Sequence, residues 1–395
     1  MTLSVTINPS YERLLRMKKA ARMKEKLHRE QMKEASRISR EKQTQEEKAK
    51  HMHATRERAR RDWVRYNEAE AREHQHVIKV LLPELCKVGA ARMDEESVDN
   101  TSISQKAGRG RPKLKNEDIL YCAILKVYSN RASRYSAGLM EMVESMSIID
   151  RAPHFNAVSK FLNREDITIH LRDMLRLSAL PLSSLETKFA IDSSGFRTTA
   201  YNSWMPEKHH VKVKNVWLKA HIASGVLTNI ITDAKITSGS SADVLEFREL
   251  LGNTTEVFDV DEIYADKGYL ARYNLQFAED RDIAAFIPFK KNTRGLSRGS
   301  SAWYHAYQMF TEHPEEFYSH YHLRSNVETT FSCVKEKLGE TLKSKNERAQ
   351  INELYCKLIA YNLTVVNKAM LIHEVQPEFS SVELRFGEGS NRAAV

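Results

Sequence analysis

The chain has 395 residues and a formal net charge of +9, and 41% of its residues are hydrophobic, enough for the cores of two or three domains. The absence of any run of about eighteen apolar residues argues against a membrane-spanning helix, and the first residues lack the basic-then-apolar pattern of a secretory signal. The four cysteines lie far apart, which favours reduced thiols in a cytoplasm over a disulfide framework or a zinc site.

The positive charge is concentrated near the N-terminus. Residues 11–61 contain 18 Lys or Arg and 8 Asp or Glu, whereas the rest of the chain holds 43 basic and 44 acidic residues. Residues 11–74 lack Pro and Gly and are rich in helix-forming residues, but their apolar residues are too sparse for a coiled-coil seam. We interpret residues 1–89 as a basic helical arm that binds DNA phosphates without reading sequence, or else as a solvated helix without a partner. Its apolar end, Val77–Cys86, is expected to dock on the core.

Residues 90–116 predict a basic linker. Within it, Gly108-Arg-Gly-Arg-Pro112 is similar to a minor-groove AT-hook, in which extended Arg side chains fit a narrow groove. Arg109 and Arg111 are therefore candidate DNA contacts, and a plain basic linker is the favoured alternative.

Residues 117–182 predict a domain of four short helices, with Asn116 as the N-cap of the first. A compact helical domain ahead of a larger α/β region is typical of a helix-turn-helix DNA-binding module. A helical cap that only packs on the core is the alternative.

Residues 183–376 show the pattern of a mixed α/β domain. Short apolar runs predict five strands, and the segments between and after them predict helices. The strands are expected at 188–192, 215–223, 230–237, 262–266 and 284–289, and the helices at 241–251, 270–281, around Glu328 and at 350–372. This order predicts an RNase H-like five-stranded mixed sheet flanked by helices, followed by a flexible tail at 377–395.

Three acidic residues come from separate predicted elements. Asp192 and Asp266 each end an apolar strand, and Glu328 lies on a later helix. Three other acids compete for the second position: Asp259, Asp261 and Glu262. Asp266 ranks first because it alone lies in an Asp-Lys-Gly-Tyr turn. Carboxylates from three elements suit a pair of Mg²⁺ ions, which can hold the attacking and leaving oxygens of an in-line phosphoryl displacement.

Polar side chains around Glu328 share one face of the predicted helix. Tyr321 and Arg324 lie seven and four residues before Glu328, and Lys335 lies seven residues after it. At about 100° per residue these positions fall within a narrow stripe. A carboxylate, two cations and a phenol on one stripe indicate a face that binds an anion through a metal. An ion pair between these cations and a neighbouring acid is the alternative.

These motifs resemble those of the DDE transposases of the insertion-sequence 4/5 superfamily. The Tyr-Arg-Glu-Lys signature of that group is met at every spacing by Tyr321, Arg324, Glu328 and Lys335, and its first two acidic motifs are similar to those around Asp192 and Asp266. The resemblance extends from about residue 108 to residue 374.

The resemblance implies a DNA transposase that cleaves at terminal inverted repeats and transfers the freed strand into target DNA. It implies that Asp192, Asp266 and Glu328 hold two Mg²⁺ ions, with Mn²⁺ as a substitute, and that Tyr321, Arg324 and Lys335 contact the transposon end. It also implies a homodimer in the active complex, located in a prokaryotic cytoplasm without membrane attachment. A transposase-derived DNA-binding protein that no longer transposes, or an RNase H-fold nuclease that cuts without joining, are the alternatives.

Overall fold

The computed structural model describes residues 23–24, 60, 63–99, 113–198, 217–296 and 299–380. The chain divides into two compact units, 1–65 and 66–395, and the fold below is that of the second unit. Arg109, Arg111, most of the basic arm and the tail after residue 380 lie outside the described residues. Among the residues described, no helix has the length and apolar character needed to span a membrane.

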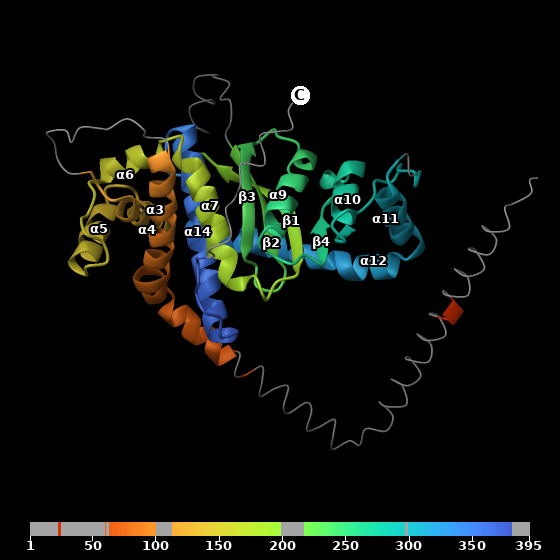
Figure 1. The fold of residues 1–395 in the computed structure, drawn as a ribbon, viewed down its shortest axis with the longest axis horizontal. Coiled ribbons are helices and arrows are strands. Elements are labelled where there is room, and N and C mark those ends of the chain that lie inside the picture. Colours follow the sequence, from red (N-terminus) through yellow and green to blue (C-terminus); the bar gives the residue numbers. More distant parts are fainter. Residues whose placement is uncertain are drawn as a thin grey trace, which may run out of the picture. The chain divides into compact units, whose positions relative to one another are not determined.

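A mixed five-stranded sheet forms the centre of the unit, with the strand order β3-β2-β1-β4-β5 (Figure 1). Strands β1 and β2 pair antiparallel, as do β2 and β3, whereas β4 runs parallel to both β1 and β5. The strands are β1 (Lys188–Arg197), β2 (Trp217–Gly225), β3 (Ile231–Ser238), β4 (Glu262–Ala265) and β5 (Ala284–Phe286). This is the RNase H-like arrangement that the order of elements predicts.

Helices provide the crossovers that parallel strand pairs require. Helix α9 (Phe247–Thr255) connects β3 to β4, and α10 (Arg272–Glu279) connects β4 to β5. Three further helices lead to the region of Glu328: α11 (Ser301–Glu312), α12 (Pro314–Tyr321) and α13 (Ser325–Leu338). Within the described residues between β5 and α13 the chain forms no strand.

The region before β1 contains the four predicted helices. These are α4 (Asn116–Tyr128), α5 (Ser136–Ser145), α6 (Phe155–Leu162) and α7 (Ile167–Ala179). The predicted cap of α4 is wrong, because Lys115 occupies the N-cap position without a side-chain cap bond. The Asn116 side chain instead donates a hydrogen bond to Asp94 Oδ1 at 2.7 Å.

The apolar segment before residue 90 docks on the core, as predicted. A π-helical turn (Val77–Leu81) leads into helix α3 (Leu82–Asp99), and Leu85 is fully buried. The prediction that a linker begins at residue 90 is wrong, because helix α3 continues to Asp99. Gly89 lies at a close approach between α3 and α7, because an added Cβ would lie 2.8 Å from Met174 Sδ.

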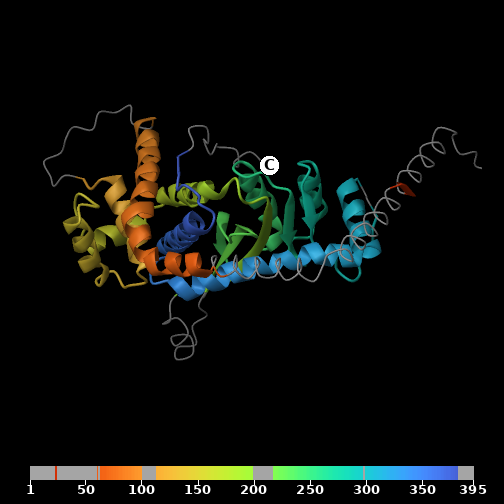
Figure 2. The same cartoon turned by 90° about the horizontal axis from the view of Figure 1, so that it is seen from below.

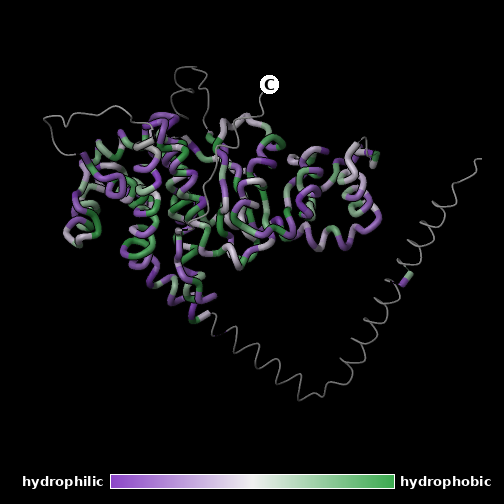
Figure 3. The backbone as a smooth tube through the Cα atoms, viewed as in Figure 1, coloured by the Kyte–Doolittle hydropathy of each residue, from purple (hydrophilic) through white to green (hydrophobic). Residues whose placement is uncertain are grey.

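Helix α14 (Glu347–Ile372) joins the helical region to the sheet. It packs against α4, α7, α13 and β3, and most of its residues between 349 and 369 are buried. Around the other helices, hydrophilic and hydrophobic residues alternate, so that each has an apolar side (Figure 3). The helical region and the sheet therefore share one core within one compact unit.

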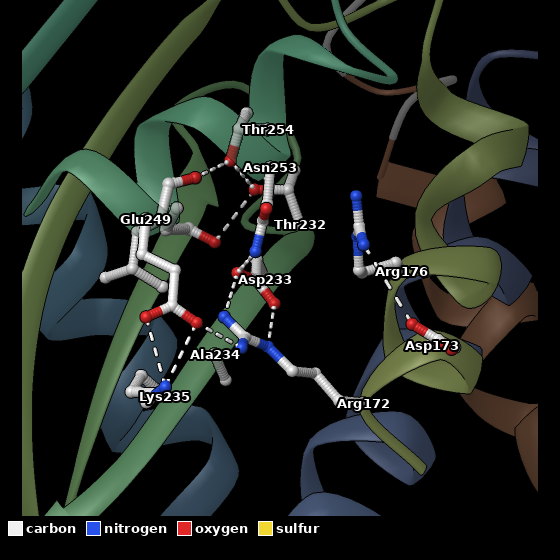
Figure 4. Close-up of polar contacts among 12 residues, drawn as sticks. Arg172, Asp173, Arg176, Thr232, Asp233, Ala234, Lys235, Glu249, Asn253 and Thr254 are labelled. Atoms are coloured by element: carbon white, nitrogen blue, oxygen red, sulfur yellow. Dashed lines mark hydrogen bonds and ion pairs between the residues drawn. The ribbon is translucent and has the colours of Figure 1, made fainter. Parts of the chain in front are cut away.

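A polar network also fastens α7 to the sheet (Figure 4). Arg172 donates to both carboxylate oxygens of Asp233 in β3, at 2.9 and 2.6 Å, and contacts Glu249 of α9. Asn253 donates to Asp233 at 2.7 Å, and Lys235 pairs with Glu249 at 3.0 Å. Because Asp233 is fully buried, this network fixes α7 on β3 through charge pairing as well as apolar packing.

Candidate active site

Strands β1 and β4 bring Asp192 and Asp266 to neighbouring positions. Their parallel register pairs Ile191 with Ala265, the residues that immediately precede the two acids. Asp192 Oδ1 accepts a hydrogen bond from the Ser193 amide at 2.8 Å, and Asp266 Oδ1 accepts one from the Gly268 amide at 2.5 Å. Each carboxylate is therefore oriented by the backbone that follows it.

Asp192 does not end its strand, contrary to the prediction. Residues Ser193–Arg197 continue β1 because they pair antiparallel with Trp217–His221 of β2. The parallel pairing with β4, however, stops at Ile191. Asp192 thus lies at the point where β1 is no longer paired with β4. Its partly buried carboxylate lies beside this end of the parallel pairing.

The predicted single helix around Glu328 consists of consecutive helical segments. Tyr321 ends α12, a 3₁₀ turn covers His322–Arg324, and α13 begins at Ser325. The backbone remains right-handed helical at Tyr321, at Arg324 and at Ser325, so α12 and α13 form one nearly straight run (Figure 2). The polar side chains predicted to share one helix face therefore lie on one continuous helical run, although a 3₁₀ turn interrupts the α-helix.

Arg324 connects Asp192 to Glu328. Its Nη1 lies 2.6 Å from Asp192 Oδ2, and its Nη2 contacts Glu328 Oε1. The side chains of Asp192 and Arg324 are each 18% exposed, whereas that of Glu328 is 59% exposed. Of the two interpretations of Arg324, the structure shows the ion pair with neighbouring acids.

The pKa shifts of Asp192 and Tyr321 reflect the charges around them. Burial raises the pKa of Asp192, and nearby Asp266 raises it further, while the Ser193 amide and Arg324 act in the opposite direction. Burial also raises the pKa of Tyr321, and Asp266, Asp192 and Glu328 all contribute to that rise. The Tyr321 phenol therefore lies within electrostatic range of all three carboxylates.

Lys335 lies beside the same strand as Asp192. Its Nζ donates to Ser194 Oγ at 2.7 Å and lies 5.3 Å from the centre of the Phe196 ring. Ser194 is two residues beyond Asp192 and therefore points to the same face of β1. Burial lowers the pKa of Lys335. The structure thus links Asp192 and Glu328 through Arg324, places Asp266 near Asp192, and places Lys335 against Ser194, two residues beyond Asp192 on β1.

Comparison with known families assigns this part of the chain. Residues 183–363 match the family model described as transposase DDE domain. The matched range begins shortly before β1, ends within α14 and includes Asp192, Asp266 and Glu328. This region belongs to the transposase DDE domain family. The match supports a transposition enzyme that acts on DNA, and domains of this family generally use divalent metal ions.

The donor chemistry of the DDE domain fits a hard divalent cation. Two half-buried carboxylates, Asp192 and Asp266, lie close enough for one to disfavour ionisation of the other, and a cation would relieve that repulsion. Glu328 is joined to Asp192 through the Arg324 guanidinium. Over the described ranges, no three His, Cys, Asp or Glu side chains are close enough together to hold one ion in this arrangement.

The sequence analysis missed a second polar cluster in the DDE domain. Asp243 follows β3 and contacts Ser193 of β1 and both Lys219 and His221 of β2. The sequence signal was weak, because an acid near the start of a predicted helix is common at a helix N-terminus. Only the register of β1 and β2 shows which side chains it meets.

Proposed function

We propose that the chain is a DDE transposase of the insertion-sequence 4/5 superfamily, which cuts DNA at the ends of its element and joins those ends to target DNA. The observation that carries the proposal is the Arg324 guanidinium between Asp192 of β1 and Glu328 of α13, with Asp266, which follows β4, within electrostatic range of Asp192 and of the Tyr321 phenol. The match to the transposase DDE domain supports the reaction class. The complete Tyr-Arg-Glu-Lys spacing supports the superfamily.

The three acids are the residues that would hold divalent ions, Mg²⁺ or its substitute Mn²⁺, in the active complex. A bound pair of such ions stabilises charge on the attacking and leaving oxygens of a phosphodiester. Arg324 and Lys335 provide cationic groups at the edge of the same site and bind phosphate oxygens of the transposon end. Tyr321 packs against Phe317 with ring centroids 5.9 Å apart, which fixes the position of its phenol beside the acids.

DNA recognition is proposed for the parts of the chain outside the DDE domain. The helical region at residues 117–182 is the candidate for double-stranded DNA at the terminal inverted repeats. The basic N-terminal arm and the Arg109 and Arg111 segment are candidates for contacts with phosphates or the minor groove. Since two transposon ends must be held together for joining, the active complex is proposed to be a homodimer.

A strand-transfer assay tests this function. The purified chain would be incubated with Mg²⁺, labelled DNA carrying the ends of its element, and a target plasmid, and the wild type would be compared with Glu328→Gln. The matched control is Glu336→Gln, an exposed acid two turns further along α13. Joined products from the wild type and the control, but not from Glu328→Gln, would support the proposal.

Other outcomes separate the alternatives. Cleavage without joining would favour a nuclease, and binding without cleavage would favour a DNA-binding protein that no longer transposes. Full activity of Glu328→Gln would remove Glu328 from the catalytic set.

A further inference from the structure

Asp243 is a fourth acid beside the catalytic residues, and its environment differs from that of a solvated surface carboxylate. It opens a short 3₁₀ turn (Asp243–Leu245) between β3 and α9, and its side chain is 27% exposed. Two donors reach its Oδ1, Ser193 Oγ at 3.0 Å and Lys219 Nζ at 2.5 Å, and His221 Nδ1 lies 3.3 Å from the same oxygen. A carboxylate that collects donors from two strands acts as a structural tie between them.

The strand register explains why these donors meet. Ser193 of β1 pairs with His221 of β2, and Gly195 pairs with Lys219. Residues directly opposite each other, and those two positions along, share one face of an antiparallel pair. Ser193, Lys219 and His221 therefore present one polar surface, and the turn after β3 places Asp243 against it.

Ser193 transmits this contact to Asp192. Its backbone amide donates to Asp192 Oδ1 at 2.8 Å, while its hydroxyl donates to Asp243. Because the side chain is held by Asp243, the peptide unit between residues 192 and 193 is held as well. The orientation of the Asp192 carboxylate thus depends on an acid that lies 51 positions later in the sequence.

Gly268 connects Asp243 to the second acid. A Cβ added at Gly268 would lie 2.7 Å from Asp266 Oδ1 and 3.5 Å from Asp243 Oδ2. Both carboxylates therefore lie close to the Cα of Gly268, in the turn after β4. The next residue, Tyr269, is fully buried, and its hydroxyl lies 3.4 Å from His221 Nδ1 within the same cluster.

The charge of the cluster indicates its role. Lys219 balances the negative charge of Asp243. His221 is fully buried, and burial lowers its pKa to about 4, so the imidazole is neutral at pH 7. The two ring nitrogens of His221 lie 3.4 Å from the Tyr269 hydroxyl and 3.0 Å from Thr237 Oγ1. The cluster is neutral overall and holds its neighbours in place without adding charge to the catalytic site.

We propose that Asp243 is a positioning residue for DNA cleavage and joining, which holds Asp192 through Ser193 and braces the Asp266 turn at Gly268. This proposal rests on the proposed function, in which Asp192 and Asp266 act together on a divalent ion. It assigns to Asp243 a part in the reaction without direct contact with DNA.

The test compares Asp243→Ala, Asp243→Asn, Ser193→Ala and the Ser193→Ala/Asp243→Ala double variant in the full chain. The control is Asp280→Ala, an exposed acid of the same domain whose contact is with Gln276. Loss of a group that orients a ligand costs about 10- to 100-fold in activity. Asp243→Ala is therefore expected to slow cleavage by about that factor and to raise the Mg²⁺ concentration needed for half-maximal cleavage.

Two further results are expected. Asp243→Asn should retain an intermediate rate, because its amide oxygen still accepts hydrogen bonds. The double variant should be no slower than Asp243→Ala, because both changes break one linkage. Gel-shift binding of end DNA without divalent ions, and the melting temperature of the metal-free protein, should match the wild type.

A readout without DNA keeps this test separate from the proposed function. Mn²⁺ that binds the folded chain should raise its melting temperature, and the rise should be smaller in Asp243→Ala than in Asp280→Ala. If the wild type cuts no DNA, the proposed function fails, but the Mn²⁺ comparison still decides the role of Asp243. Equal Mg²⁺ and Mn²⁺ responses in wild type and Asp243→Ala would overturn the inference. The inference would also be overturned if Asp243→Ala lowered the binding of end DNA and the melting temperature as much as it lowered the cleavage rate. That result would indicate a purely structural role for Asp243.

Discussion

Arg324 Nη1 lies 2.6 Å from Asp192 Oδ2, although the two residues are 132 positions apart in the sequence. The same guanidinium contacts Glu328 one helical turn later. A fixed cation between two acids stabilises their ionised forms in a partly buried site. Arg324 therefore helps to set the protonation state of the carboxylates that the proposed chemistry requires.

Replacing Arg324 should shift the pH dependence of cleavage. Arg324 lowers the pKa of Asp192, which burial has raised, so Arg324→Ala should raise that pKa further. Asp192 then ionises only at higher pH, so the acid limb of the plot of cleavage rate against pH should shift to higher pH. The cleavage rate near neutral pH should fall by at least about tenfold. Arg324→Lys keeps the charge but loses the bidentate geometry of the guanidinium. Its acid limb should therefore lie between those of the wild type and Arg324→Ala. An unchanged acid limb in Arg324→Ala would contradict this role.

Lys335 should contribute to affinity for the transposon end through phosphate contact. Its Nζ is held by Ser194 Oγ at 2.7 Å, which leaves two of its three donors for DNA. Lys335→Ala is expected to weaken binding of end DNA and to reduce the slope of log affinity against log salt by about one. Ser194→Ala is the matched comparison, because it removes the tether and keeps the charge. If both variants show the wild-type salt slope, Lys335 binds no phosphate.

The positions of the strands along the chain could be predicted because most of them contain an apolar run that the core buries. Phe189, Ala190 and Ile191 are fully buried, and their pattern predicts the first strand correctly. The continuation of β1 through Ser193–Arg197 could not be predicted. Those residues are extended because they pair with β2, and pairing with a strand more than twenty residues away leaves no local apolar signature.

The proximity of Glu328, Arg324 and Tyr321 could be predicted from their spacing, whereas the partners of Asp243 could not. Glu328, Arg324 and Tyr321 lie within eight residues, so local helical geometry relates them even though the helix changes type between them. The partners of Asp243 are supplied by β1 and β2, and only the sheet register brings them together. Helix α11 was not predicted either, although Ser300 is a typical N-cap residue. Its Oγ accepts a hydrogen bond from the Trp303 amide at 3.2 Å.

A methyl group at Gly268 should displace Asp266. The added Cβ would lie 2.7 Å from Asp266 Oδ1, closer than contact distance, so the carboxylate must turn away from the Gly268 amide. Gly268→Ala is expected to reduce cleavage by about 10- to 100-fold while the protein remains folded. Gly138→Ala is the control, since its Cβ meets nothing within 4 Å in α5. Wild-type cleavage by Gly268→Ala would show that Asp266 tolerates displacement.

Arg172 should be important for stability rather than for chemistry. Removing it leaves the fully buried Asp233 without its main countercharge, as the network in Figure 4 shows. Loss of one partner of a buried pair costs about 3–5 kcal/mol, so Arg172→Ala should lower the free energy of unfolding by about that amount in urea titrations. The control is Arg164→Ala, whose pair with Asp166 is exposed on both sides and should cost about 1 kcal/mol or less. Equal losses in the two variants would rule out a special role for the buried pair.

His221 should make the protein less stable in acid. Burial lowers its pKa to about 4 in the folded protein, compared with about 6.5 in an unfolded chain. Between these values the unfolded chain binds a proton that the folded protein does not, so the free energy of unfolding falls as the pH falls. The full effect across that window is about 3 kcal/mol, at about 1.4 kcal/mol per pH unit.

His221→Asn removes the titrating group while it keeps a short polar side chain near Asp243 and Thr237. Urea unfolding at pH 7, 6 and 5 should therefore show a shallower loss of stability in His221→Asn than in the wild type. At pH 7 the variant should be the less stable of the two, because it loses the ring contacts, and the gap should narrow toward pH 5. The exposed His373→Asn serves as the control for a generic loss of histidine. If wild type and His221→Asn keep a constant difference from pH 7 to pH 5, then His221 does not resist protonation in the folded protein.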